Sequence, residues 1–503
     1  MLDRRAAGIL LAVSSLPSPY GIGSFGDAAR NWLRFLNAAG QKYWQILPLG
    51  PTGWGDSPYQ SFSAFAISPY YVDLSALIEQ GLLLKKEVDA IRWGKKADTV
   101  DYGTLYSHRE TILRLACERF IKNADAEKTG AINAAAFDSF QSANCFWLDD
   151  YSLFMALKKK HEGRPWLEWD KPLKLRDKAA LEKIKQQLSS EIYFHSFVQF
   201  LAFAQWQAIK DYARDLDIAI IGDMPIYVAA DSADAWANSD LFQLDNECKP
   251  LRVAGCPPDP FATGGQLWGN PLYRWDVIAE TNFAWWIARL RSSFALYDVV
   301  RIDHFRGLES YYSIDANAHD AAGGEWVRGP GLRFIEAVNR ELPGAAIIAE
   351  DLGFLTPEVR ALLAASGYPG MKVLQFAFDS REESDYMPYL YERNCAVYTG
   401  THDNSTSPGW LRSADQNDVR MALDFFGLKN GKEAHWGFIR CALACVANTA
   451  IIPMQDYLGL DDRARINIPA VLGGNNWRWR MLPTAASAAL AKKIRRLTAI
   501  CGR

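Results

Sequence analysis

The chain has 503 residues, of which 49% are hydrophobic, 22% charged and 13% aromatic. This composition is typical of a globular protein and excludes a collagen-like, disordered or coiled-coil chain. Lysine and arginine number 55 against 58 aspartate and glutamate residues, a formal net charge of −3, so no positive excess is available to neutralise phosphates and nucleic acid is not expected as a partner.

Short apolar runs, most of them followed by turn residues and a helical stretch, predict the strands of a buried parallel sheet. The first run follows two arginines and imitates a secretory signal, but it is short and is needed as the first strand. Helices are predicted at 27–39, with Asp27 as N-cap, and at 192–215. The runs lie at 8–13, 43–49, 218–223, 299–303, 346–350, 371–376, 396–401 and 449–456.

Eight such units predict an α/β fold, a (β/α)₈ TIM barrel rather than an open doubly wound sheet. The gap between the second and third predicted strands is too long for a loop, and its middle is charge-rich, as is typical of solvated helical faces. We therefore expect an inserted, mainly helical subdomain at 76–194 and a catalytic barrel formed by 1–75 and 195–503. After the last strand only 457–503 remains, too little for a C-terminal β-sandwich domain.

Carboxylates end three of the predicted strands. Arg301 and Asp303 end the fourth, and because side chains alternate along a strand they point the same way. We expect the arginine to lower the pKa of Asp303 and keep it ionised. Glu350 ends the fifth strand, and Asp403 ends the seventh beside His402. Barrel active sites are built at the C-terminal ends of the strands, so the three carboxylates are predicted to converge, although a cap or turn would explain any one alone.

Converging carboxylates are typical of glycosidic chemistry, in which one ionised carboxylate attacks the anomeric carbon and a protonated one donates to the leaving oxygen. The neighbouring arginine suits Asp303 to the first task. The apolar run before Glu350 suits it to the second, and Asp403 with His402 suits a third, that of holding sugar hydroxyls. The 18 tryptophans and 21 tyrosines also suit a site that stacks against sugars.

At these residues the chain resembles the α-amylase superfamily, and within it the amylomaltases or 4-α-glucanotransferases of glycoside hydrolase family 77. The matching segments cover most of the chain outside 76–194, in collinear order. The missing C-terminal β-domain agrees with this branch. The segments are SSLPSPYGIGSFG (14–26), WQILPLGPTGWGDSPYQSFSAFA (44–66), GDMPIYVAADSADAWAN (222–238), PPDPFATGGQLWGNPLYRW (257–275), LYDVVRIDHFRG (296–307), IIAEDLG (347–353), YTGTHDN (398–404) and MQDYLGLDDRARINIPA (454–470).

The resemblance implies an enzyme that moves α-1,4-glucan segments from a maltooligosaccharide, starch or glycogen donor to the 4-OH of glucose or another glucan. The implied mechanism is a retaining double displacement through a covalent glycosyl-enzyme. Asp303 is then the nucleophile, Glu350 the general acid/base and Asp403 the transition-state stabiliser. A retaining hydrolase of the α-amylase type is the alternative.

Further residues are implied as substrate contacts. Tyr59 and Trp268 are the aromatic platforms of the donor and acceptor subsites. The stretch 251–275, Gly/Pro-rich over 255–271, is a flexible lid over the bound glucan, and Pro260, where some members carry Tyr beside the equivalent of Phe261, changes the sugar contact of that lid rather than the chemistry. The other implied contacts are Ser57, Asp223, Gln266, Arg301, His304 and His402.

Three other functions were weighed. The segment 21–26 spells GxGxxG, but SSLPSPY separates it from the preceding strand and the next strand lacks an acidic ribose contact, which argues against a dinucleotide site. A glucan-binding module without catalysis would not need the three carboxylates. A polar cluster at 231–240 could bind calcium, but its spacing fits no EF-hand, and the seven histidines give no zinc pattern. No metal or cofactor is expected.

The eight cysteines form no CxxC pair and are expected to be free thiols, which fits a reducing compartment. No apolar run approaches the roughly 18 residues of a membrane helix. We expect a cytoplasmic, bacterial enzyme without membrane contact, and the sequence leaves its oligomeric state open.

Overall fold

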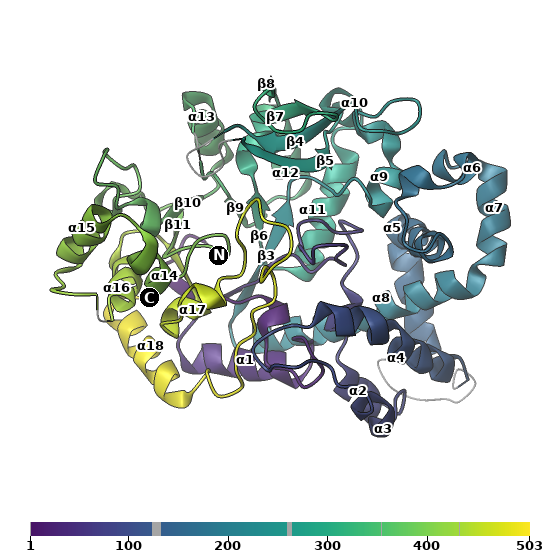
Figure 1. Ribbon diagram of the computed structural model, residues 1–503, viewed down its shortest axis with the longest axis horizontal. Helices are drawn as coiled ribbons and strands as arrows, with labels where there is room; N and C mark the ends of the chain where they lie inside the picture. The colour runs from purple at the N-terminus through teal and green to yellow at the C-terminus, as the bar shows by residue number, and fades with distance from the viewer. Residues whose placement is uncertain (1, 123–131, 259–263, 354, 432) are drawn as a thin grey trace.

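The computed structural model describes residues 2–122, 132–258, 264–353, 355–431 and 433–503. Its centre is a parallel sheet of eight strands in the order β10-β11-β12-β1-β2-β3-β6-β9 (Figure 1). The backbone N–H of Ala349, in β9, donates to the carbonyl of Pro369, just before β10, at 2.9 Å, so the two ends of the sheet meet in a nearly closed barrel. The strands are β1 (Ala6–Leu10), β2 (Tyr43–Gln45), β3 (Ala219–Pro225), β6 (Val299–Asp303), β9 (Ile347–Ala349), β10 (Gly370–Val373), β11 (Cys395–Tyr398) and β12 (Thr449–Pro453).

Each of the eight predicted runs overlaps one of these strands, so the predicted TIM-barrel fold is confirmed. Side chains that point into the barrel form one buried cluster, to which Ile221, Val299 and Ile348 each contribute from a different strand. All three are fully buried. Their burial fixes the register of β3, β6 and β9, because a slip of one residue would turn every inward side chain outward.

Helices cover the outside of the barrel (Figure 1). The first begins at Asp27, with Gly26 rather than the predicted Asp27 in the cap position. A Cβ on Gly26 would lie 2.3 Å from the Asp73 carboxylate, so this glycine of the GxGxxG segment serves close packing within the chain. The covering helices include α1 (Asp27–Ala38), α8 (Ser189–Asp215), α11 (Ala284–Leu296), α12 (Gly331–Glu341), α13 (Pro357–Ser366), α14 (Ser407–Ser413), α15 (Gln416–Phe426), α16 (His435–Ala444) and α18 (Ala488–Ile500).

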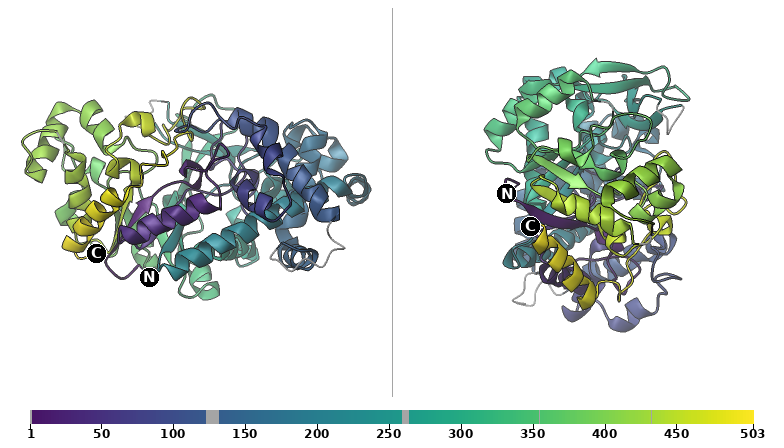
Figure 2. Two further views of the ribbon diagram at one scale, coloured as in Figure 1. Left: turned by 90° about the horizontal axis from the view of Figure 1, so that it is seen from below. Right: turned by 90° about the vertical axis from the view of Figure 1, so that its left-hand side faces the viewer.

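A helical insertion separates β2 from β3, as predicted, and projects to one side of the barrel (Figures 1 and 2). The long helix α8 continues from it into the barrel wall without a break at residue 194, and the subdomain limits 76–194 stay a prediction. The helices of the insertion before α8 are α2 (Leu74–Glu79), α3 (Lys85–Asp89), α4 (Tyr102–Lys122), α5 (Ala134–Lys160), α6 (Lys171–Lys174) and α7 (Lys178–Gln187).

A second sheet, antiparallel and four-stranded, was not predicted. Its order is β5-β4-β7-β8, and β4 and β5 lie within the stretch expected to be a lid. Residues 259–263 of that stretch, with Pro260 and Phe261, lie outside the described residues. The short helices α9 (Ala233–Ala237) and α10 (Trp275–Glu280) flank β4 and β5 in sequence. The strands are β4 (Arg252–Cys256), β5 (Gln266–Pro271), β7 (Ser310–Asp315) and β8 (Glu325–Arg328).

Beyond β12 the chain forms α17 (Met454–Tyr457), an extended stretch and α18, and no β-sandwich follows within the described residues. The two ends of the chain lie near each other in Figures 1 and 2, and the Arg503 guanidinium donates to the Ala6 carbonyl at 3.0 Å. Among the described helices, none is long and apolar enough to cross a membrane.

Candidate active site

The polar residues of the site continue the inward-facing rows of the barrel core. Asp223 lies two residues beyond Ile221 on β3, and Arg301 lies two residues beyond Val299 on β6. The register of the two strands places Asp223 opposite Arg301. Since successive side chains alternate, the same pattern that buries the aliphatic core turns these charged groups inward at the C-terminal ends of the strands.

Arg301 joins two of the carboxylates. Its Nη1 lies 2.6 and 2.7 Å from the two carboxylate oxygens of Asp223 and 3.0 Å from Oδ1 of Asp303. Asp223 and Arg301 are buried, whereas 27% of the Asp303 side chain is exposed. Asp303 is therefore the carboxylate of this group that remains accessible to a ligand.

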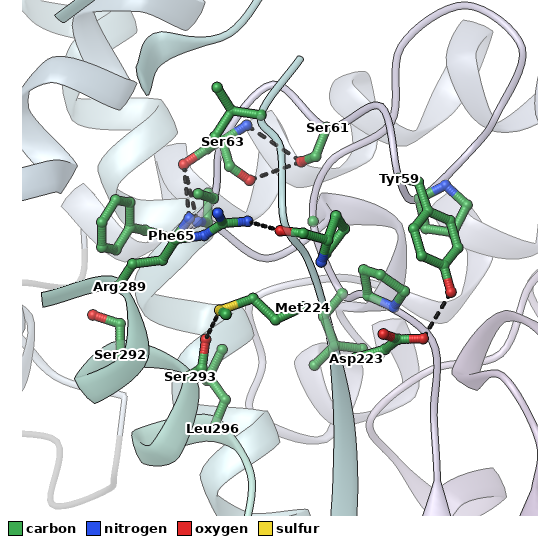
Figure 3. A pocket seen from close by; sticks show the side chains of 18 of the residues that line it. Tyr59, Ser61, Ser63, Phe65, Asp223, Met224, Arg289, Ser292, Ser293 and Leu296 are labelled. Atoms are coloured by element: carbon green, nitrogen blue, oxygen red, sulfur yellow. Dashed lines mark hydrogen bonds between the residues drawn. The ribbon is translucent and has the colours of Figure 1, made fainter. Parts of the chain in front are cut away.

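Tyr59 lies on the long loop after β2 and closes one side of this group. Its hydroxyl donates to Oδ2 of Asp223 at 2.7 Å, and its ring stacks on His402 with centroids 5.1 Å apart and an interplanar angle of 11° (Figure 3 shows Tyr59 and Asp223). The Tyr59 backbone N–H donates to Oγ of Ser57 at 3.3 Å. Tyr59 thus brings the loop after β2 and the loop after β11 to the same point.

Glu350 follows β9 and is held by two backbone donors. Its Oε2 accepts from the His304 N–H at 2.7 Å and its Oε1 from the Leu352 N–H at 2.8 Å. His304 adopts the left-handed conformation, with φ 54°. This turn directly after β6 aims the N–H of His304 at the Glu350 carboxyl. Glu350 is therefore held by the residue that directly follows Asp303 in the chain.

Asp403 follows β11 and is held by a segment close to the C-terminus. Its Oδ1 accepts from Nδ2 of Asn467 at 2.6 Å and lies 3.3 Å from Nε2 of His402. The Arg465 guanidinium donates to its backbone carbonyl. The Asp403 side chain is 43% exposed, so it faces the ligand side of the site as Asp303 does.

The electrostatics differ from the prediction at Asp303. Burial raises the pKa of Asp303, the charges of Asp223 and Glu350 raise it further, and Arg301 only partly opposes them. Arg301 lowers the pKa of Asp303 as predicted, but the predicted net lowering is wrong, because burial outweighs the arginine and the charges of Asp223 and Glu350 add to the rise. Burial also raises the pKa of Glu350, as its apolar setting predicted, against the opposing effects of Arg301 and the two backbone donors.

Sequence and structure comparisons agree with this geometry. The pattern of a protein family described as 4-alpha-glucanotransferase matches residues 11–485. The chain belongs to the 4-alpha-glucanotransferase family. It is an enzyme of this type, acting on α-1,4-glucans.

Relatives of this family match along nearly the whole chain. The 4-alpha-glucanotransferase of Clostridium butyricum is 45% identical over 98% of this chain and 99% of its own, and that of Thermus thermophilus is 45% identical over 98% and 97%. An amylomaltase from Streptococcus agalactiae, solved in complex with acarbose, superposes with a TM-score of 0.95 at 37% identity over 99% of this chain and 100% of that one. A Corynebacterium glutamicum amylomaltase, 18% identical with a TM-score of 0.79, shares the fold.

In this 4-alpha-glucanotransferase, Trp268 and Gln266 stand on β5 of the second sheet. The Trp268 ring lies edge-on to His304, with centroids 4.9 Å apart and an interplanar angle of 89°. Its Nε1 donates to Oε1 of Gln266 at 3.1 Å, and its backbone carbonyl accepts from Gln60 at 3.3 Å. The antiparallel sheet therefore brings an aromatic side chain to the residue that follows Asp303.

A small cavity lies behind Asp223 and Tyr59, between the loop after β2, the end of β3 and α11 (Figure 3). Its volume is about 60 Å³, well below the roughly 300 Å³ at which small-molecule sites begin. Arg289 lines it and donates to the Ile226 carbonyl at 3.0 Å, which ties α11 to the segment after Asp223. The cavity is thus part of the support of Asp223 and not a substrate site.

Three contributors to the site were not predicted as site residues. Asn467 and Arg465 contact Asp403, and the Trp477 ring lies 5.8 Å from Tyr59 and 6.0 Å from His402. They lie beyond β12, where no strand end marks a position in the barrel. The match of segment 454–470 to family 77 was the available signal for the first two.

The polar cluster weighed as a calcium site is engaged by protein groups. Oδ2 of Asp231 accepts from Nζ of Lys158 at 2.7 Å, and Oδ2 of Asp234 accepts from the Ala64 N–H at 2.7 Å. These carboxylates hold the insertion and the loop after β2 to the segment after β3.

Proposed function

We propose that this family member transfers α-1,4-glucan segments to the 4-OH of glucose or of another glucan by a retaining double displacement. The observation that carries the proposal is that Asp303 and Glu350 lie at the ends of neighbouring strands. The N–H of His304, the residue after Asp303, donates to the Glu350 carboxyl. In retaining enzymes the two carboxyl groups stand on opposite sides of one scissile bond, about 5–5.5 Å apart.

Asp303 is the nucleophile in this proposal. Its ionised carboxylate attacks the anomeric carbon of the donor sugar and forms the glycosyl-enzyme ester. Glu350 gives its proton to the glycosidic oxygen, and the shortened glucan leaves as an alcohol. In the second half, Glu350 removes the proton from the 4-OH of the acceptor, whose oxygen attacks the anomeric carbon and releases the Asp303 carboxylate.

Burial raises the pKa of Glu350 and so favours its protonated form. The raised pKa of Glu350 is a shift in the direction that a general acid needs. The raised pKa of Asp303 works against its role, because the nucleophile must be ionised. The pair therefore works best with one proton, on Glu350, and the contact with Arg301 favours the charge on Asp303.

The remaining polar residues hold the donor sugar. We expect Asp403 and His402 to bind its hydroxyls, whereas the buried Asp223–Arg301 pair acts through its contact with the Asp303 carboxylate. Burial lowers the pKa of His304 to about 3, so this ring stays neutral and can bind sugar oxygens without adding positive charge beside Asp303.

The two aromatic platforms stay proposals on their positions. Tyr59, with Ser57 beside it, is the donor-side platform and stands over the Asp223 carboxylate. Trp268, with Gln266 as its hydrogen-bond acceptor, is the acceptor-side platform and stands over His304. An acceptor site that binds glucan and excludes water directs the glycosyl-enzyme to transfer.

Transfer and hydrolysis are separated by the products from maltotriose. We expect glucose together with longer oligosaccharides and little net gain of reducing ends. A steady gain of reducing ends would favour the alternative, a retaining hydrolase. The Asp303→Asn variant serves as the blank for both products.

The domain limits are proposed as predicted: a barrel of 1–75 and 195–503, an inserted subdomain at 76–194 and a lid at 251–275. The lid is tested by a variant in which β4 and β5 no longer pair with the rest of the second sheet. The expected result is a higher share of hydrolysis among the products. A cytoplasmic location stays a prediction.

A further inference from the structure

A groove away from the carboxylates lies between the loop after β1 and the segment after α3. Its volume is about 750 Å³, which is within the range of small-molecule sites. The loop contributes residues 17–21, and the far wall comes from α3 and the stretch 91–97. Arg480 and Pro483, near the C-terminus, close one side.

The walls of the groove are fixed by close packing. Gly21 has φ 84°, and a Cβ there would lie 2.4 Å from the Trp93 carbonyl oxygen. The rings of Tyr20 and Trp93 meet at 6.3 Å with an interplanar angle of 66°, and Nε1 of Trp93 donates to the Val88 carbonyl at 3.0 Å. The groove is therefore formed before any ligand arrives, with the half-buried Tyr20 ring on its lining.

Arg480 brings a buried positive charge to this groove. Only 5% of the residue is exposed. Its Nη2 donates to the carbonyls of Leu16 at 3.2 Å and Ser18 at 2.7 Å, while Nε has no hydrogen-bond partner. Within the described ranges no carboxylate forms an ion pair with it, in contrast to Arg301, and burial lowers the pKa of Arg480 to about 10.

Lysines add to this charge. Lys95 and Lys96 are exposed on the groove lining, and the described part of the chain offers neither an ion-pair partner. Lys85 is paired with Asp89, so these two cancel. The groove is thus positively charged in a chain whose formal net charge is −3. A buried charge without a counter-ion is costly, and a bound anion would remove that cost.

We propose that this groove binds a phosphate ester of a sugar, with the phosphate against Lys95, Lys96 and the Arg480 side and the sugar ring against Tyr20. Arginine and lysine are the usual protein partners of phosphate, and an aromatic face beside them suits a sugar ring. The site is separate from the proposed transfer reaction, because within the described ranges no residue of the groove lining forms a hydrogen bond or ion pair with Asp303, Glu350 or Asp403. Its failure would therefore leave the proposed function intact.

The test is the affinity of the wild-type enzyme for glucose 6-phosphate and for inorganic phosphate, measured by isothermal titration calorimetry at low salt. We expect the ester to bind more tightly than inorganic phosphate, because only the ester reaches Tyr20. Equal affinity for both would restrict the site to phosphate alone and contradict the sugar part of the proposal. No binding of either at millimolar concentration would overturn it.

Two variants with the same loss of charge localise the binding. Lys95→Gln with Lys96→Gln should weaken glucose 6-phosphate binding at least tenfold and leave transfer from maltotriose unchanged. The matched control is Lys178→Gln with Lys183→Gln, two exposed lysines on α7, which should leave binding unchanged. Equal affinities in the two double variants would contradict the proposal.

Arg480→Lys probes the buried end of the groove. The variant keeps the positive charge but loses the planar fork of donors, so weaker binding by the folded variant is expected. Circular dichroism and maltotriose transfer report whether it is folded. Unaltered affinity in a folded Arg480→Lys variant would exclude the guanidinium from the site, and the lysine pair decides the proposal should this variant fail to fold.

Discussion

Asp303 and Asp223 both contact the Arg301 guanidinium, and this sharing sets the chemistry of the site. Replacing Asp303 with asparagine keeps the shape and removes the nucleophile. We expect transfer from maltotriose to fall by roughly 10⁴-fold or more, the order of loss typical of a missing nucleophile. The measurement is the initial rate of glucose release, with circular dichroism as the control for folding. A variant that retains a tenth of the wild-type rate would contradict the assignment.

The same substitution should stabilise the fold in a pH-dependent way. Burial raises the folded-state pKa of Asp303 above its unfolded value of about 3.9, so ionisation costs the folded protein more than the unfolded chain. This cost is absent below the unfolded pKa and is complete above the folded pKa. The melting temperature of Asp303→Asn should therefore exceed that of the wild type by more at pH 8 than at pH 4.

Asp379→Asn is a control of opposite sign. Hydrogen bonds from Arg381 lower the pKa of Asp379, so its contribution is present above the unfolded pKa and is lost on acidification. This variant should be less stable than the wild type at pH 8, with a smaller difference at low pH. If the gain in melting temperature of Asp303→Asn is independent of pH, a raised pKa of Asp303 is excluded.

The pH dependence of transfer tests the charge next to Asp303. Because the nucleophile must be ionised and its pKa is raised, the acid limb of kcat/KM should lie clearly above the ordinary aspartate range. The charge of Asp223 contributes to the rise. Asp223→Asn should lower the rate but move the acid limb to lower pH, and an unmoved limb would show that Asp223 does not set the pKa.

Asn467 is the residue whose role is most easily isolated. Loss of its hydrogen bond to the Asp403 carboxylate is worth about 1.5–3 kcal/mol, so Asn467→Ala should lower kcat by about 10- to 100-fold. The exposed Asn475, in the same stretch, provides the matched control Asn475→Ala, for which no change is expected. Equal effects of the two substitutions would contradict a specific role for Asn467.

At the scale of elements, the eight strands were predictable because buried parallel strands read as continuous apolar runs. The carboxylates at their ends were predictable because barrel geometry fixes which end carries the site. The sheet of β4, β5, β7 and β8 was not, because its strands are partly exposed and therefore do not form continuous apolar runs. The raised pKa of Asp303 was missed because its main causes, burial and the charge of Asp223 on another strand, come from the fold and not from neighbours in sequence.

Trp268 is the residue through which the second sheet is expected to contribute to the acceptor subsite. Trp268→Ala should raise the ratio of hydrolysis to transfer several-fold, because the acceptor loses its platform and water gains access to the glycosyl-enzyme. Leu267→Ala, an exposed neighbour on the same strand, is the control and should leave the ratio unchanged. Reducing ends and oligosaccharides from maltotriose give the ratio directly. A ratio that stays constant in Trp268→Ala would remove this residue from the acceptor subsite.

At the scale of the whole molecule, residues from the loop after β2, the ends of four barrel strands (β3, β6, β9 and β11), the second sheet and the segment beyond β12 meet at one place. Strand ends in the sequence could indicate the contributors from the barrel. Family segments could indicate those from the loop after β2 and from the second sheet. The family match of segment 454–470 marked Asn467, but the sequence could not show that Asn467 contacts Asp403 or that Trp477 lies beside His402. Long-range packing decides it.

The most direct measurement traps the covalent intermediate. In Glu350→Gln, α-maltosyl fluoride should still glycosylate the enzyme, because fluoride leaves without a proton, and the ester should accumulate, because no base activates an acceptor. Mass spectrometry of the digested protein is predicted to find one maltosyl group on the peptide that contains Asp303. A maltosyl group on another carboxylate, or no adduct while the fluoride is consumed, would contradict the proposed double displacement.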